Sequence, residues 1–238
     1  IEEEYKMNIS SFITPFKNKH YLQTSVIFML FLASWSIWWS FFQIWLTSKD
    51  NGLGLTGGQV GIIYSTNSFI TLLLMFVYGV TQDKLALKRT LLIFCSLFSS
   101  LVGPFFIWIY APLIQNNFWI GTFVGAIFLS CGYLAAVGAY EAVVERICRY
   151  FNFNYGHSRA WGSFGYAIMA LIAGFVFVIN PHLNFWIGSL IGLTLLLVLI
   201  FWKTDSEQRA KDSIERNPEE SEPAIKNMLK VLKVKEIW

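Results

Sequence analysis

Residues 21–48 read YLQTSVIFMLFLASWSIWWSFFQIWLTS, a run of 28 residues without a charged side chain. A helix needs about 20 apolar residues, each rising about 1.5 Å, to cross the hydrocarbon core of a bilayer. The run is therefore long enough for one transmembrane helix. It lacks the strict alternation of apolar and polar residues that marks a strand of an outer-membrane barrel, so an α-helix is the predicted form.

Three further charge-free runs occupy residues 51–82, 90–140 and 160–202. The first opens with a glycine-rich segment that we place outside the membrane. The other two are too long for one helix, and each contains helix-breaking residues: Ala111-Pro112 with Gln115-Asn116-Asn117 in one, Asn180-Pro181-His182 in the other. We therefore predict an all-α integral membrane protein with six spans, at about 22–46, 59–81, 90–110, 118–145, 159–179 and 183–202.

The charged residues support a membrane bundle in the middle of the chain. Hydrophobic residues make up 55% of the 238 residues and charged residues 14%, against about 25% charged in soluble domains. Of 33 charged side chains, 16 lie in 203–238 and 6 in 1–21, which leaves 11 for residues 22–202. This central region cannot be a water-soluble fold. The net charge of +3 is modest, and it gives no reason to expect a nucleic-acid partner.

The Lys and Arg residues predict the orientation. One side of the membrane collects Lys6, Lys17, Lys19, Lys84, Lys88, Arg89, Arg146, Arg149 and the tail, and the other has Lys49 alone. Positively charged loops face the cytoplasm. We therefore expect a multi-pass protein of the cell membrane with both termini cytoplasmic. Residues 1–21 form the cytoplasmic N-terminus, 22–202 the bundle, and 203–238 a charged cytoplasmic segment.

The sequence gives no sign of an enzyme. Its three cysteines, Cys95, Cys131 and Cys148, and its three histidines lack the spacing of metal ligands, and we expect the thiols to be reduced packing residues. A hydrolase elbow, a Walker loop and a dinucleotide fingerprint are all missing from the sequence. We predict no catalytic residues, no metal site and no cofactor.

Glu141 and Arg159 are charged residues at membrane depth or at its edge. Glu141 lies in the fourth span, and Arg159 opens the fifth. A charge at membrane depth costs about 2.5 to 3.5 kcal/mol on insertion scales, so a chain that keeps one there usually uses it. A carboxylate and a guanidinium facing a watery cavity offer the acceptors and forked donors that bind sugar hydroxyls. The alternatives are a structural ion pair, or an arginine that marks the cytoplasmic end of its span.

The loop between the second and third spans carries one carboxylate among several cations. It contains Gly79, Asp83, Lys84, Lys88 and Arg89. Asp83 can accept hydrogen bonds from neighbouring helix ends, and the cations follow the positive-inside rule for cytoplasmic loops. The residues alone predict a charged latch between helices, or charges that only set the topology.

This loop resembles the signature loop of the major facilitator superfamily. The stretch from Tyr140 to Tyr166, with NFNYGHSRAWGSFGY at its end, is similar to the fourth and fifth spans of the oligosaccharide:proton symporters, the family of the lactose and sucrose permeases. Further agreement comes in order from Ile44-Trp45-Leu46, Gly103-Pro104-Phe105 and Asn184-Phe185-Trp186. The resemblance covers about residues 16–205.

The resemblance implies a role for each matching residue. Glu141 and Arg159 match the pair that holds the sugar hydroxyls in these permeases. Tyr166 stands where lactose permeases have a tryptophan that stacks on the galactosyl ring, and Ser163 where they have a cysteine beside the sugar. These two substitutions look more like the sucrose branch, whereas Glu141 agrees with the lactose branch. Sucrose, raffinose or melibiose, and lactose all stay open as substrates.

The resemblance also implies a role for the loop and for the chain as a whole. In the superfamily the aspartate that Asp83 matches helps lock one conformation. The family loop normally has glycine at the position of Ala86, so this chain departs from the pattern there. Members have twelve spans, and the residues that carry the coupled proton lie in the second bundle. This chain would be the N-terminal half, missing the C-terminal six-helix bundle. Two alternatives stay open: a self-sufficient six-span protein acting as a dimeric pore or sugar sensor, and half of an efflux permease.

Overall fold

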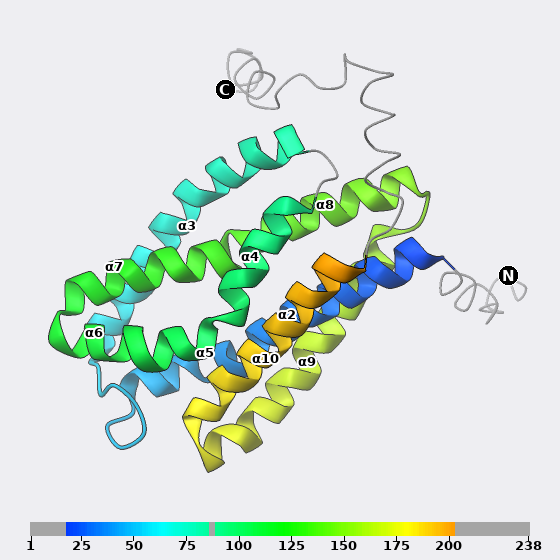
Figure 1. The fold of residues 1–238 in the computed structure, drawn as a ribbon. Coiled ribbons are helices and arrows are strands. Elements are labelled where there is room, and N and C mark those ends of the chain that lie inside the picture. The colour runs from blue at the N-terminus through cyan, green and yellow to red at the C-terminus, as the bar shows by residue number, and fades with distance from the viewer. Residues whose placement is uncertain (1–17, 86–88, 203–238) are drawn as a thin grey trace, which may run out of the picture.

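The computed structural model describes residues 18–85 and 89–202, and in these ranges it contains helices and no strand. The elements are α2 (Lys19–Thr47), α3 (Gly57–Leu85), α4 (Thr90–Ser100), α5 (Val102–Pro104), the π-helical η2 (Phe105–Tyr110), α6 (Ala111–Asn116), α7 (Phe118–Leu129), the π-helical η3 (Ser130–Leu134), α8 (Ala136–Tyr150), α9 (Tyr155–Ile179) and α10 (Pro181–Phe201). Five helices of the described part are long and apolar enough to span a membrane, and one bent pair supplies a sixth. The predicted all-α, six-span class is confirmed (Figure 1).

The bent pair is the third span. Its two parts, Thr90–Ser100 and Val102–Asn116, meet at an angle of 47°. A proline ring clashes with the carbonyl four residues earlier and cannot donate to it, so Pro104 disrupts the helix at Ser100. The amide of Gly103 instead donates to Oγ of Ser189 on α10 at 2.7 Å, which supports the bend from outside.

The break predicted between the third and fourth spans is confirmed at Gln115-Asn116-Asn117 and wrong at Ala111-Pro112. The helix passes through Pro112 and ends at Asn116. The π-helical η2 precedes the proline, and the amide of Ala111 pairs with Phe106 O, five residues back. This wider turn leaves room for a residue without an amide hydrogen. The chain reverses only at Asn117, which has extended backbone and accepts the amide of Ile120 at 3.2 Å.

The second predicted break is at the expected place. Asn180 separates α9 from α10 with φ −163° and ψ 118°. Its Oδ1 accepts the amide of His182 at 2.9 Å, and Pro181 occupies the first helical position, where no amide is needed. A single residue therefore ends one span and caps the next.

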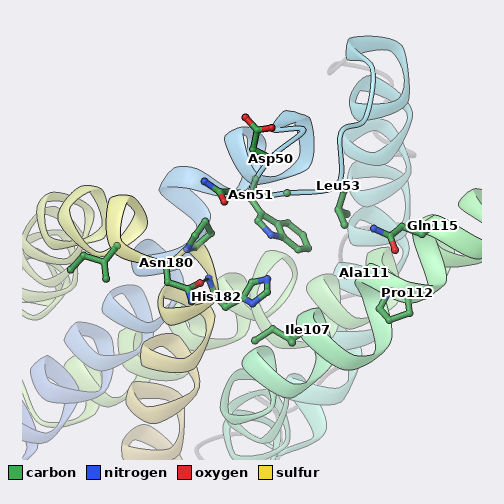
Figure 2. Close-up of a pocket in the computed structure, with 13 residues that line it drawn as sticks. Asp50, Asn51, Leu53, Ile107, Ala111, Pro112, Gln115, Asn180 and His182 are labelled. Atoms are coloured by element: carbon green, nitrogen blue, oxygen red, sulfur yellow. Dashed lines mark hydrogen bonds between the residues drawn. The ribbon is translucent and has the colours of Figure 1, made fainter.

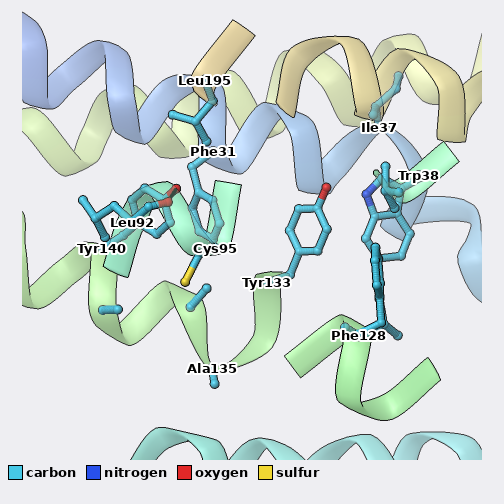
Figure 3. Packing of buried hydrophobic residues seen from close by; sticks show 14 of the residues in the cluster. Phe31, Ile37, Trp38, Leu92, Cys95, Phe128, Tyr133, Ala135, Tyr140 and Leu195 are labelled. Atoms are coloured by element: carbon cyan, nitrogen blue, oxygen red, sulfur yellow. Dashed lines mark hydrogen bonds between the residues drawn. The ribbon is translucent and has the colours of Figure 1, made fainter. Parts of the chain in front are cut away.

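Aromatic rings fill the centre of the bundle. Phe106 of η2 lies 5.2 Å from Trp38 of α2 and 4.8 Å from Phe185 of α10, between ring centroids. Nearer the start of α2, Phe31 stacks on Tyr140 of α8 at 4.1 Å between ring centroids (Figure 3). The outer faces of the helices are also apolar, as expected where a bilayer or another protein bundle replaces water.

The beginning of α2 and the end of α10 lie at the same end of the bundle (Figure 1). Gln23 of α2 and Trp202 after α10 are in hydrogen-bond contact there. An even number of spans requires this arrangement. The same end carries Arg89 and the turn from α8 to α9, so the cationic residues described there gather on one side.

Candidate functional site

The structure brings Glu141 and Arg159 together. Glu141 projects from α8 and Arg159 from the second turn of α9, and Nε of the arginine donates to Oε1 of the glutamate at 2.9 Å. Nη2 approaches the same oxygen at 2.8 Å. Because both contacts use Oε1, Oε2 lies outside this pairing. The arginine side chain is 47% exposed and the glutamate 35%, so the pair lies on an accessible face of the described bundle.

The helix that carries Arg159 begins one turn earlier than the sequence suggested. The predicted fifth span starts at residue 159, whereas α9 starts at Tyr155. Asn154 caps it by accepting the amide of Gly156 at 2.8 Å. Arg159 therefore lies inside a regular helix, which fixes the direction of its side chain.

Ser163 and Tyr166 share a face with Arg159. They follow it on α9 by four and seven residues, a spacing that keeps side chains on one stripe of an α-helix. Ser163 is exposed and Tyr166 half-buried. The register thus gathers the charged pair, a hydroxyl and an aromatic ring along about two turns of helix.

The neighbouring face of α9, which carries Gly162 and Gly165, packs closely on α2. A Cβ on Gly162 would lie 2.8 Å from Cδ1 of Leu32, and one on Gly165 would lie 2.8 Å from the carbonyl oxygen of Met29. Only glycine permits this approach of the two helices. Ser36 of α2 donates to the carbonyl oxygen of Tyr166 at 2.7 Å. These contacts fix the stripe relative to the core.

Two further contacts hold the first turns of α9, and sequence reasoning missed both. Oγ1 of Thr24 and Oγ of Ser158 are 3.2 Å apart, and Nε1 of Trp161 donates to the hydroxyl of Tyr21 at 3.0 Å. Ser158 and Trp161 lie on either side of Arg159. Nothing in the sequence identifies these partners, because they are more than a hundred residues apart.

The predicted latch residues lie at the end of α3 and after it. Gly79 is an exposed residue of α3. The side chains of Asp83 and Lys84, and the whole of Lys88, lie outside what the structure describes. Arg89 is described: it is 4% exposed, and its Nη1 donates to the carbonyl oxygen of Trp202 at 2.6 Å. This cation therefore caps the end of α10 in addition to contributing to the predicted topology.

A separate cavity of about 550 Å³ lies at the other end of the bundle (Figure 2). Its polar lining includes Asp50, Asn51, Gln115, Asn180 and His182. None of the predicted site residues lines it. Its edge at Ile179 is 20 residues beyond Arg159 on α9, about 30 Å at 1.5 Å per residue. This cavity is not the Glu141–Arg159 site.

Comparison with known proteins identifies the family of this chain. The family model described as the LacY proton/sugar symporter matches residues 13–238. A sucrose permease of Escherichia coli is 46% identical over 194 residues, covering 82% of this chain and 46% of that protein. A lactose permease of Citrobacter freundii is 36% identical over 198 residues, covering 83% and 47%. A raffinose permease of Escherichia coli is 30% identical over 222 residues, covering 93% and 52%.

The chain spans about half the length of the curated relatives it matches. The match runs through the six helices and confirms the resemblance drawn from the signature loop and from residues 140–166. We conclude that this chain belongs to the LacY proton/sugar symporter family.

Proposed function

We propose that this chain is the N-terminal half of a proton-coupled oligosaccharide symporter and supplies one side of its sugar site. The observation that carries the proposal is the exposed pair formed by Glu141 and Arg159. In transporters built from two bundles, substrate binds at the midplane between them, and the bundles rock to expose it to each side in turn. The pair lies on a face that such a second bundle would cover.

The chemistry of the pair suits a sugar. Each sugar hydroxyl can donate one hydrogen bond and accept another. The guanidinium of Arg159 supplies several donors in a fixed plane, and the carboxylate of Glu141 supplies acceptors, including Oε2. A neutral polyol can therefore bridge the two groups without leaving either charge uncompensated.

The neighbouring residues add shape to the site. The ring of Tyr166 offers a flat apolar surface for the C–H face of a sugar ring, and the hydroxyl of Ser163 offers one more donor and acceptor. Both lie on the stripe of Arg159. Sucrose is the first sugar to assay, because the relative at 46% identity is a sucrose permease; raffinose, melibiose and lactose follow.

The remaining functions are assigned to the protein as a whole. The coupled proton would be carried by the second bundle, as the family resemblance implies. The bundle would lie in the cell membrane with both termini cytoplasmic, since the cationic loops gather on one side. Asp83 and its neighbouring cations would lock one of the two conformations.

The test is equilibrium binding of radiolabelled sucrose to the complete protein and its Glu141→Gln variant. We expect the variant to lose binding by at least about tenfold, since the carboxylate's charge-assisted contacts are lost. Glu145→Gln is the matched control: it lies one turn away on α8, in an exposed pair with Arg149. Equal binding by wild type and Glu141→Gln would leave the pair with a structural role only.

A further inference from the structure

The carbonyl oxygen of Trp202 is a meeting point of three helices. Nη1 of Arg89 donates to it at 2.6 Å and Nε2 of Gln23 at 2.5 Å. The two donor residues are 4% and 3% exposed. Arg89 directly precedes α4, Gln23 lies in the second turn of α2, and Trp202 follows α10. One backbone oxygen therefore joins the beginnings of two spans to the end of a third.

The hydrogen bonds from Arg89 and Gln23 satisfy a carbonyl oxygen at the end of a helix. The last carbonyls of a helix have no partner within it, and they form the negative end of the helix dipole. A buried guanidinium meets both needs, and a charge-assisted hydrogen bond is roughly twice as strong as a neutral one. Gln23 adds a second, neutral donor. Removing a donor from such a site leaves a partly buried oxygen less well satisfied.

The same turn of α2 also holds the helix of Arg159. Thr24 bonds to Ser158 and Tyr21 accepts from Trp161, and these two partners bracket Arg159 on α9. Tyr21, Gln23 and Thr24 are consecutive or nearly so, so they move together as one helical turn. Ser158 is fully buried, which leaves this part of α9 little room to shift alone.

We propose that the α2 turn Tyr21–Thr24 is a mechanical junction, and that Gln23 is a positioning residue for Arg159. Through Gln23 the turn is linked to the end of α10 and to Arg89, the residue that precedes α4. Through Tyr21 and Thr24 it sets the first turns of α9. A displacement of Arg89 or of the end of α10 thereby changes the sugar site. This inference rests on the proposed role of Arg159 in sugar binding.

The test is Gln23→Met in the complete protein, which keeps the side-chain length and removes the donor. We expect faster amide hydrogen exchange at residues 155–162, by about fivefold, and sucrose binding weakened about three- to tenfold, the range for one buried hydrogen bond. The matched control is Gln43→Met, an exposed position near the other end of α2. Faster exchange confined to the end of α10, with α9 and binding unchanged, would overturn the junction.

The arginine offers a graded comparison. Arg89→Lys keeps a cationic donor and should retain most of the protection of α9, whereas Arg89→Met should reproduce the effect of Gln23→Met. If both arginine variants show wild-type amide exchange in α9 and wild-type sucrose binding, the hydrogen bond from Arg89 to the oxygen of Trp202 does not affect α9.

A measurement without variants guards against failure to fold. Coupling between two sites is reciprocal. If the position of the end of α10 affects sugar binding, sugar binding must also affect the end of α10. Saturating sucrose should slow amide exchange at residues 198–202 of the wild-type complete protein. Sucrose that binds and protects α9 alone would refute the junction while leaving the proposed sugar site intact. Failure of the proposed site would show itself differently, as unchanged binding in Glu141→Gln.

Discussion

Arg159 contacts one oxygen of Glu141 through two of its nitrogens, Nε at 2.9 Å and Nη2 at 2.8 Å. The two residues are 18 positions apart and come from adjacent antiparallel helices. A structural ion pair in a membrane protein is usually enclosed, because the surrounding medium solvates charge poorly. On the described bundle the two side chains of this pair are instead 47% and 35% exposed. Its exposure supports the proposed site between two bundles.

The first prediction concerns the planar geometry of the arginine. Arg159→Lys keeps the positive charge but replaces the fork with a single ammonium group, which cannot place two nitrogens on one carboxylate oxygen in the same way. We expect sucrose affinity of the complete protein to fall by at least about tenfold, with normal membrane insertion. Isothermal titration or equilibrium dialysis measures it. Arg149→Lys, in an exposed pair with Glu145, should bind like wild type.

The second prediction concerns the contact between α2 and α9. In Gly165→Ala the new methyl group would lie 2.8 Å from the backbone oxygen of Met29, which cannot move aside as a flexible side chain can. We expect a lower thermal midpoint of unfolding in detergent and weaker sucrose binding, because overpacking costs about 1–3 kcal/mol and displaces the stripe. Gly61→Ala serves as the control, since nothing lies within 4 Å of its added methyl group. Equal midpoints for the two variants would contradict the close packing.

Much of the fold was predictable because its signals are local. Charge-free runs of membrane length predict six spans, and the Asn-Pro pair at 180–181 marks a reversal that needs no tertiary information. The prediction failed at Pro112 for a physical reason. A π-helical turn, which the sequence does not announce, can absorb a proline, and the bend of the third span lies near Pro104 instead.

The site was predictable only in part. The cost of charge in a membrane singles out Glu141 and Arg159 from the sequence alone. The partners of Gln23, Arg89 and Trp161 could not be predicted in this way. Two of these residues donate to an oxygen whose identity depends on how distant helices pack, and the third binds a tyrosine 140 residues away.

The third prediction separates the ring of Tyr166 from its hydroxyl. If the ring face stacks on the sugar, Tyr166→Phe should change sucrose affinity by less than about threefold, because the apolar surface is kept. Tyr166→Ala removes that surface and should weaken binding by at least about tenfold. Competition binding of both variants against wild type gives the comparison. If Tyr166→Phe instead loses as much sucrose affinity as Tyr166→Ala, the contact belongs to the hydroxyl.

The fourth prediction concerns conformational change rather than binding. Asp83 lies at the end of α3, beside the loop that leads to Arg89, and its proposed role is to lock one arrangement of the helices. A residue with that role affects the rate of interconversion more than the affinity of either state. We expect Asp83→Asn to slow sucrose uptake by at least about tenfold while changing the equilibrium dissociation constant by less than about threefold. Uptake into vesicles and binding to the same preparation are measured together. Asp50→Asn is the control, since Asp50 lies in the loop between α2 and α3 at the opposite end of the bundle and should change neither quantity. Equal losses of uptake and affinity in Asp83→Asn would place Asp83 with the binding residues and remove the latch.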